Sequence, residues 1–134
     1  MATTLAGLAF LIGAWTCTSG SGAQQFTYTA VYAYDMQNDW ISQHDTWTGG
    51  GDVGYLTYDA KGAFWNWVVL EPQGSTTVFH GTGPATHISY RTVYPPQSDG
   101  TEVFDRASDT KYATHFTGTL EGKKYDASDT CTKH

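Results

Sequence analysis

Histidine side chains are the residues of this sequence best suited to acid–base chemistry. His44, His80, His87 and His115 fall in four different predicted strands, and His134 is the last residue. An imidazole titrates close to neutral pH and can act as a general base. If the protein is an enzyme, we predict His44 or His115 as its catalytic base, for chemistry of the lyase, isomerase or hydratase type.

Other interpretations of these histidines stay open. Tyr90 and Arg91 could assist such a base by stabilising an oxyanion. His115 lies on a strand near the C-terminus and is also a candidate axial ligand for haem, the one cofactor that we consider. In the simplest interpretation each His is an ordinary strand residue on the outer surface. Alternation does not decide where His44 points, because both faces of its strand carry a Trp.

Aromatic residues form the second group with functional potential, because they make up 15% of the sequence. Along residues 26–34 the even-numbered positions are Phe, Tyr, Ala, Tyr and Tyr, and in residues 63–69 Trp65, Trp67 and Val69 share one face. Rings on one face of a strand suit either a packed core or the wall of a cavity. We predict a ligand-binding surface made of Tyr32, Trp40, Trp47, Trp65, Trp67 and Tyr90.

Several classes of site and partner lack support. No His lies at a zinc-type spacing with another His, Cys or acid, and the acidic run in residues 98–110 does not match a calcium-binding loop. We therefore predict no metal. Seven Lys and Arg against 13 Asp and Glu give a net charge of -6, without a basic stripe. This balance argues against nucleic acid as a partner.

The elements that must position these residues are almost all strands. Apolar residues recur every three or four positions only in residues 3–12, which predicts one short helix with Thr3 or Thr4 as its N-cap. Alternation and turn residues predict ten strands, at 14–19, 25–35, 39–48, 53–59, 62–71, 75–82, 84–94, 101–107, 111–120 and 123–132. The apolar stretch of residues 5–15 is too short to span a membrane, and we expect it to belong to the mature fold.

The short turns between these strands favour antiparallel neighbours in sequence order. Closure into a barrel is the arrangement that removes exposed edges, and we prefer it to a two-sheet sandwich. We therefore predict an all-β, antiparallel, up-and-down barrel of about ten strands, formed as a single domain by residues 1–134.

Cys17 and Cys131, the only two cysteines, lie in the first and last predicted strands. Closure of an up-and-down barrel makes these strands neighbours, which predicts a disulfide across the seam. The competing interpretation is two buried, reduced thiols, as a cytoplasmic location would favour. A bridge would favour a periplasmic or secreted location.

The segment LAFLIGAWTCTSG, residues 8–20, places a short apolar helix directly before Gly13, Ala14 and Trp15. This opening resembles that of calycin-superfamily barrels, in which such a Trp closes the floor. GYLTYDAKGAFWNWVVLEPQGS, residues 54–75, and RTVYPPQSDG, residues 91–100, are similar to an uncharacterised bacterial family of calycin-like proteins. Nitrobindin-like haem barrels share this type of start. In true lipocalins an Arg on the last strand stacks on the Trp, and Lys133 is the nearest substitute here.

The resemblance implies a fold with a central pocket and no particular chemistry. Our first functional hypothesis is a protein that binds a small hydrophobic or aromatic molecule in that pocket, as a monomer or homodimer. The alternatives are an enzyme that uses the same cavity and a nitrobindin-like haem barrel. The sequence does not name the ligand.

Overall fold

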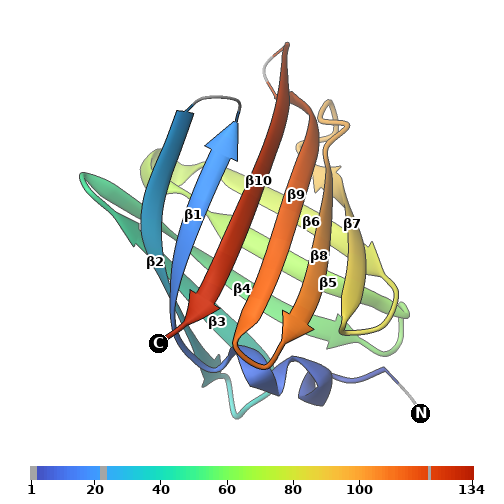
Figure 1. Ribbon diagram of the computed structural model, residues 1–134. Coiled ribbons are helices and arrows are strands. Elements are labelled where there is room, and N and C mark those ends of the chain that lie inside the picture. The colour runs from blue at the N-terminus through green and yellow to red at the C-terminus, as the bar shows by residue number, and fades with distance from the viewer. Residues whose placement is uncertain (1–2, 22–23, 121) are drawn as a thin grey trace.

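Ten antiparallel strands form a closed barrel in the computed structural model, which describes residues 3–21, 24–120 and 122–134. Each strand pairs with its neighbours in sequence, and the ring closes between the first and the last (Figure 1). The prediction of an all-β, up-and-down barrel is confirmed. The strands are β1 Gly13–Ser21, β2 Gln24–Asp35, β3 Trp40–Trp47, β4 Gly50–Asp59, β5 Phe64–Leu70, β6 Thr76–Thr82, β7 His87–Tyr94, β8 Thr101–Ser108, β9 Lys111–Leu120 and β10 Lys123–Lys133.

The N-terminal helix η1, Leu5–Leu11, crosses one end of the barrel (Figure 1). It is a 3-10 helix, and its N-cap residue Thr4 makes no side-chain capping bond. Leu8 and Leu11 are buried against the strands. Gly7 fits here because a Cβ at this position would lie 2.6 Å from the Cβ of Ala85. The helix therefore seals the barrel by close packing.

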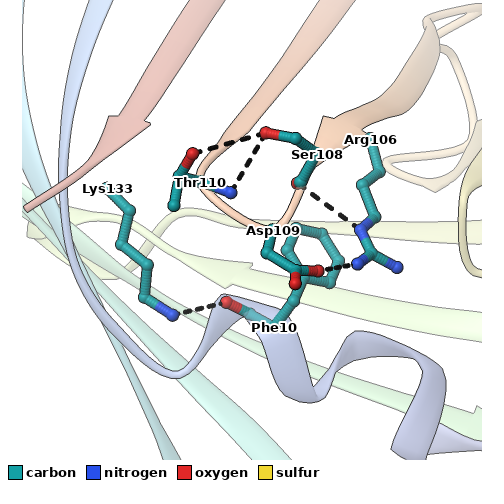
Figure 2. Close-up of polar contacts among 6 residues, drawn as sticks. All are labelled: Phe10, Arg106, Ser108, Asp109, Thr110 and Lys133. Carbon is teal, nitrogen blue, oxygen red and sulfur yellow. Dashed lines mark hydrogen bonds and ion pairs between the residues drawn. The ribbon is translucent and has the colours of Figure 1, made fainter.

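Two side chains from the strands satisfy carbonyl groups at the end of η1, which a helix leaves without partners of its own. The indole Nε1 of Trp15 donates to the carbonyl oxygen of Leu11 at 2.7 Å. Lys133 Nζ donates to the carbonyl oxygen of Phe10 at 2.8 Å (Figure 2). The same Nζ lies 5.6 Å from the Trp15 ring centroid. Lys133 thus lies over the Trp15 ring, the position at which the sequence comparison with lipocalins would place an Arg.

A second cation reaches η1 from the hairpin between β8 and β9. The Arg106 guanidinium lies 4.5 Å from the Phe10 ring centroid and forms an ion pair with Asp109 (Figure 2). The Ser108 hydroxyl accepts from the backbone N–H of Thr110 at 3.2 Å, which tightens the same hairpin. The helix is thus held by β8 and β10, the strands near the closing seam.

The seam of the barrel lies between β1 and β10, where Cys17 and Cys131 are register partners. They form a disulfide with a Cα–Cα distance of 4.1 Å, and both side chains are fully buried. The disulfide predicted from closure is therefore present. It joins residues 114 positions apart in the sequence.

Alternation along the strands separates an apolar interior from a polar exterior, as the sequence indicates. On β2, Ala30 and Tyr32 are buried while Val31 between them is exposed. On β5, Trp65 is fully buried and Trp67 packs against the core. The largest buried side chains gather near η1, and they include Trp15, Trp65, Leu8, Leu11, Ile41 and Ile88.

Most strands differ from the predicted bounds by one or two residues, and the starts of β4 and β7 differ by three. The helix covers residues 5–11 rather than 3–12, and β4 begins at residue 50 rather than 53 because glycines 50 and 51 pair with Trp47 and Thr46. β7 begins at residue 87 rather than 84, since His87 N–H bonds the Pro84 carbonyl in a turn. A second short 3-10 turn, η2, covers Pro72–Gly74. Among the described residues, no helix has the length and apolar character needed to cross a membrane.

Candidate ligand-binding cavity

A cavity of ≈ 280 Å³ lies inside the barrel. Because η1 precedes β1, it sits at the end where β1 begins; we call the opposite end the distal end. There β1, β3, β5, β7 and β9 finish and the even-numbered strands begin. The side chains that line the cavity come from η1 and from nine of the strands and their immediate flanks.

The part of the cavity next to η1 is apolar. Leu8 and Leu11 form its floor, and its walls are made by Leu56, Phe79, Ile88 and Phe104. Trp67 stacks on Phe79 with ring centroids 4.6 Å apart and planes inclined by 22°. The Tyr90 ring lies 5.4 Å from that of Trp67. Trp67 and Phe79 therefore form a stacked pair, and the Tyr90 ring is inclined by 54° to that of Trp67.

Carboxylates line the same cavity. They come from five separate places in the sequence, and they are Asp45, Asp52, Glu71, Glu102 and Asp129. Four of them lie within two residues of a strand terminus at the distal end, while Asp129 lies farther along β10. No Lys, Arg or His of the described residues lines the cavity. It therefore has an apolar half near η1 and an acidic half toward the distal end.

Asp45 and Asp52 are register partners on β3 and β4. Burial raises the pKa of both carboxyl groups above the ordinary range of Asp, and the charge of Asp52 raises the pKa of Asp45 further. Gln43 Nε2 donates to both carboxylate oxygens of Asp45 at 3.1 Å, which partly offsets this effect. The pair therefore tends to retain a proton when nothing else neutralises it.

Glu102 and Tyr90 face each other across β8 and β7. Burial raises the pKa of Glu102 to about 8, with a further increase from the charge of Asp129. Burial also raises the pKa of the Tyr90 hydroxyl, and the charge of Glu102 adds to this shift. Tyr90 is therefore a phenol, able to donate a hydrogen bond, across the whole physiological range.

Three other phenols join the acidic half to the floor. The Tyr28 hydroxyl donates to Oδ2 of Asp129, and the hydroxyl oxygens of Tyr32 and Tyr112 lie 2.7 Å apart. Burial is the largest cause that raises the pKa of all three hydroxyls. They remain neutral hydrogen-bonding groups and add no charge to the cavity.

Three of the six predicted ligand-binding residues line this cavity: Tyr32, Trp67 and Tyr90. The other three are Trp residues that do not. Trp65 is fully buried beside the floor, where its Nε1 donates to the Gly83 carbonyl at 2.9 Å. Trp47 meets Phe26 edge-on at 6.4 Å at the distal end of β3, and Trp40 is the first residue of that strand, opposite Asp35. The aromatic wall is therefore narrower than predicted.

His44 and His115, the predicted catalytic bases, do not line the cavity. His44 is exposed on β3, because Gln43 and Asp45 take the inward positions on either side of it. His115 is exposed on β9, where its Nε2 lies 2.6 Å from Oδ1 of Asp126. Neither imidazole is placed to act as a base or as an axial haem ligand inside the barrel.

The acidic residues of the cavity were missed by the sequence analysis, although alternation contains the signal. Asp129 shares a face of its strand with Cys131, and the predicted seam disulfide already turns that face inward. Glu102 likewise shares a face of its strand with Phe104, two residues farther on. Glu102 belongs to the acidic run of residues 98–110, which the sequence analysis weighed only as a calcium-binding loop.

In the part of the chain that the structure describes, no group of three or more His, Cys, Asp or Glu is placed to hold a metal ion.

No protein-family model matches the sequence, and no curated protein matches it either.

Proposed function

We propose that the protein is a calycin-like barrel that binds a small molecule with an apolar or aromatic body in its internal cavity. The observation that carries this proposal is a cavity of ≈ 280 Å³ inside a closed barrel, with Trp67, Phe79 and Phe104 on its wall. Binding pockets for small molecules are concave and mostly apolar, with a few polar groups that fix orientation. The opening around Gly13 and Trp15 supports the calycin-like assignment.

The apolar half supplies the affinity in this proposal. Burial of apolar surface contributes about 25 cal/mol per Å². The stack of Trp67 on Phe79 leaves the cavity face of the aromatic cluster free for a flat ligand. Catalysis by His44 or His115, or haem held by His115, loses its support because both side chains lie outside the cavity.

The Cys17–Cys131 bridge supports a periplasmic or secreted location. Disulfides persist in oxidising compartments and are rare where thiols are kept reduced. A binding protein in such a compartment would meet ligands from outside the cell.

Fluorescence of N-phenyl-1-naphthylamine, a neutral dye that brightens in apolar surroundings, tests the proposal. Thr114 lines the cavity from β9, so Thr114→Phe should fill part of it. Thr117 is an exposed residue of the same strand, which makes Thr117→Phe a matched control. We expect saturable binding at one dye per chain for the wild type and for Thr117→Phe, and binding weakened about tenfold or more for Thr114→Phe.

Circular dichroism establishes that each variant is folded before titration. The proposal is overturned if the folded wild type gives no saturable signal, or if the two Phe variants bind the dye equally.

A further inference from the structure

The carboxyl groups in the acidic half of the cavity have no positively charged partner among the described residues that line it. Five carboxyl groups line the cavity, and none of the described Lys, Arg or His residues does. A carboxylate removed from water is costly unless a positive charge or several hydrogen bonds accompany it. Gln43 donates a hydrogen bond to Asp45 and Tyr28 donates one to Asp129, but both donors are neutral. The positive charge that would balance this half is therefore missing from the protein itself.

A second observation points independently to an occupant. Tyr90 lines the cavity and is only 4% exposed, and its hydroxyl makes no hydrogen bond with the described residues. Its oxygen is not among the fully buried atoms that lack a partner, so it stays accessible from the cavity and is free to bond to a group there. Its register partner is Glu102. A polar ligand group between these two side chains would satisfy the phenol and meet a carboxylate.

The placement of the carboxyl groups favours an organic cation over a metal ion. Asp45 is on β3 and Glu102 is on β8, which lie five strands apart in a ring of ten. The carboxyl groups therefore surround the cavity and do not converge on one point. A metal ion requires convergent ligands, whereas an ammonium group makes hydrogen bonds and longer-range contacts in several directions.

We propose that the occupant of the cavity is an organic cation, with an ammonium or amidinium group among the distal carboxylates and an aromatic or apolar body against Trp67 and Phe79. This inference rests on the proposed function and specifies the chemical class of the ligand. The aromatic rings fit a cation as well as its body, because ring faces attract positive charge. A cavity lined by one sign of charge also concentrates ligands of the opposite sign.

The raised pKa of Glu102 is consistent with this proposal, since an empty acidic cavity retains protons in place of a counter-charge. A bound cation would favour the ionised carboxylate and release such a proton. The anion of a fatty acid, in contrast, would meet only like charges in the distal half.

A series of three phenyl compounds that differ in charge tests the ligand class. Each of 2-phenylethylamine, 2-phenylethanol and 3-phenylpropanoate is titrated at pH 8 against the complex with N-phenyl-1-naphthylamine. Glu102→Gln removes one inward carboxylate, and Asp105→Asn removes an exposed one from the same strand. We expect the affinity for the ammonium compound to be at least about tenfold higher than that for the alcohol. The carboxylate compound should bind most weakly.

Glu102→Gln should reduce the affinity for the ammonium about tenfold while the affinity for the alcohol stays within about twofold, and Asp105→Asn should change neither. If the alcohol binds as tightly as the ammonium, or the ammonium does not displace the dye at millimolar concentration, the cation inference is overturned and small-molecule binding stands. If the dye itself never binds, the proposed function fails instead. Equal loss of ammonium affinity in both variants would also overturn the inference.

Discussion

Glu102 is the residue whose charge state depends most clearly on its position in the barrel. Its carboxyl group lines an acidic cavity, opposite the unpartnered hydroxyl of Tyr90. Burial raises its pKa from 4.5 to about 8, so the empty folded protein holds a proton that the unfolded chain releases at lower pH. The free energy of unfolding must then depend on pH.

We predict that the wild type becomes less stable relative to Glu102→Gln as the pH rises from about 5 to about 8. Below pH 4.5 the carboxyl group is neutral in both states and costs nothing; between the two pKa values the folded state binds the additional proton, so each rise in pH favours unfolding. The difference should change by up to about 1.4 kcal/mol per pH unit and level off above pH 8. Urea unfolding at pH 5, 6.5 and 8 measures it. A difference that stays constant over this range would contradict the assigned environment.

At the residue level, alternation placed Tyr32 and Trp67 on the aromatic faces of their strands, and both lie on the cavity wall, as does the predicted Tyr90. Alternation failed for His44 because its strand carries a Trp on each face, so two opposite orientations satisfied the same pattern. The inward position of Asp45 resolves this ambiguity. It is part of a tertiary arrangement, with Gln43 and Asp52 lining the same cavity, that periodicity does not encode.

At the scale of elements, η1 determines the depth of the cavity because Leu8 and Leu11 form its floor. A 3-10 helix of seven residues has little stability of its own and depends on its contacts with the strands. Lys133 and Arg106 supply two of these contacts, to the carbonyl and the ring of Phe10 (Figure 2).

We predict that Lys133→Met lowers the free energy of unfolding by about 1 to 3 kcal/mol, because it removes a charged hydrogen bond to the Phe10 carbonyl and keeps most of the aliphatic stem. Amide hydrogen exchange of Leu8 and Leu11 should accelerate as η1 loosens. Lys111→Met, on the neighbouring strand at an exposed position, is the control. An equal effect of the two substitutions would mean that the contact with η1 contributes nothing.

Strand positions could be predicted well because turn residues bracket each alternating run. The start of β4 could not, because three consecutive glycines read as a loop although two of them pair with β3. Glycine carries no side-chain signal, so its pairing is decided by the partner strand. The 3-10 form of η1 was equally hidden, since the same apolar spacing suits an α-helix.

At the scale of the whole molecule, one covalent bond joins the two strands that close the barrel. Cys17 and Cys131 could be paired from the sequence because closure of an up-and-down barrel makes the last strand the second neighbour of the first. The absence of further cysteines made the assignment unique.

We predict that reduction of this disulfide lowers the free energy of unfolding by about 4 to 5 kcal/mol, through the added freedom of the unfolded chain. The measurement is urea unfolding with and without dithiothreitol, and a Cys17→Ala, Cys131→Ala double variant should show no response to the reductant. Thiol titration of the unreduced, denatured wild type should find no free thiol. Two free thiols per chain would show that the bond does not form.

An organic cation in the barrel interior should hold its charge among the distal carboxylates. Intermolecular nuclear Overhauser effects between the protein and trimethyl(2-phenylethyl)ammonium test it most directly. We expect contacts from the N-methyl protons to Tyr90 and Glu102, and from the phenyl protons to Trp67 and Phe79. Contacts confined to exposed residues such as Phe26, or phenyl protons among the carboxylates with the ammonium against Leu8 and Leu11, would contradict it.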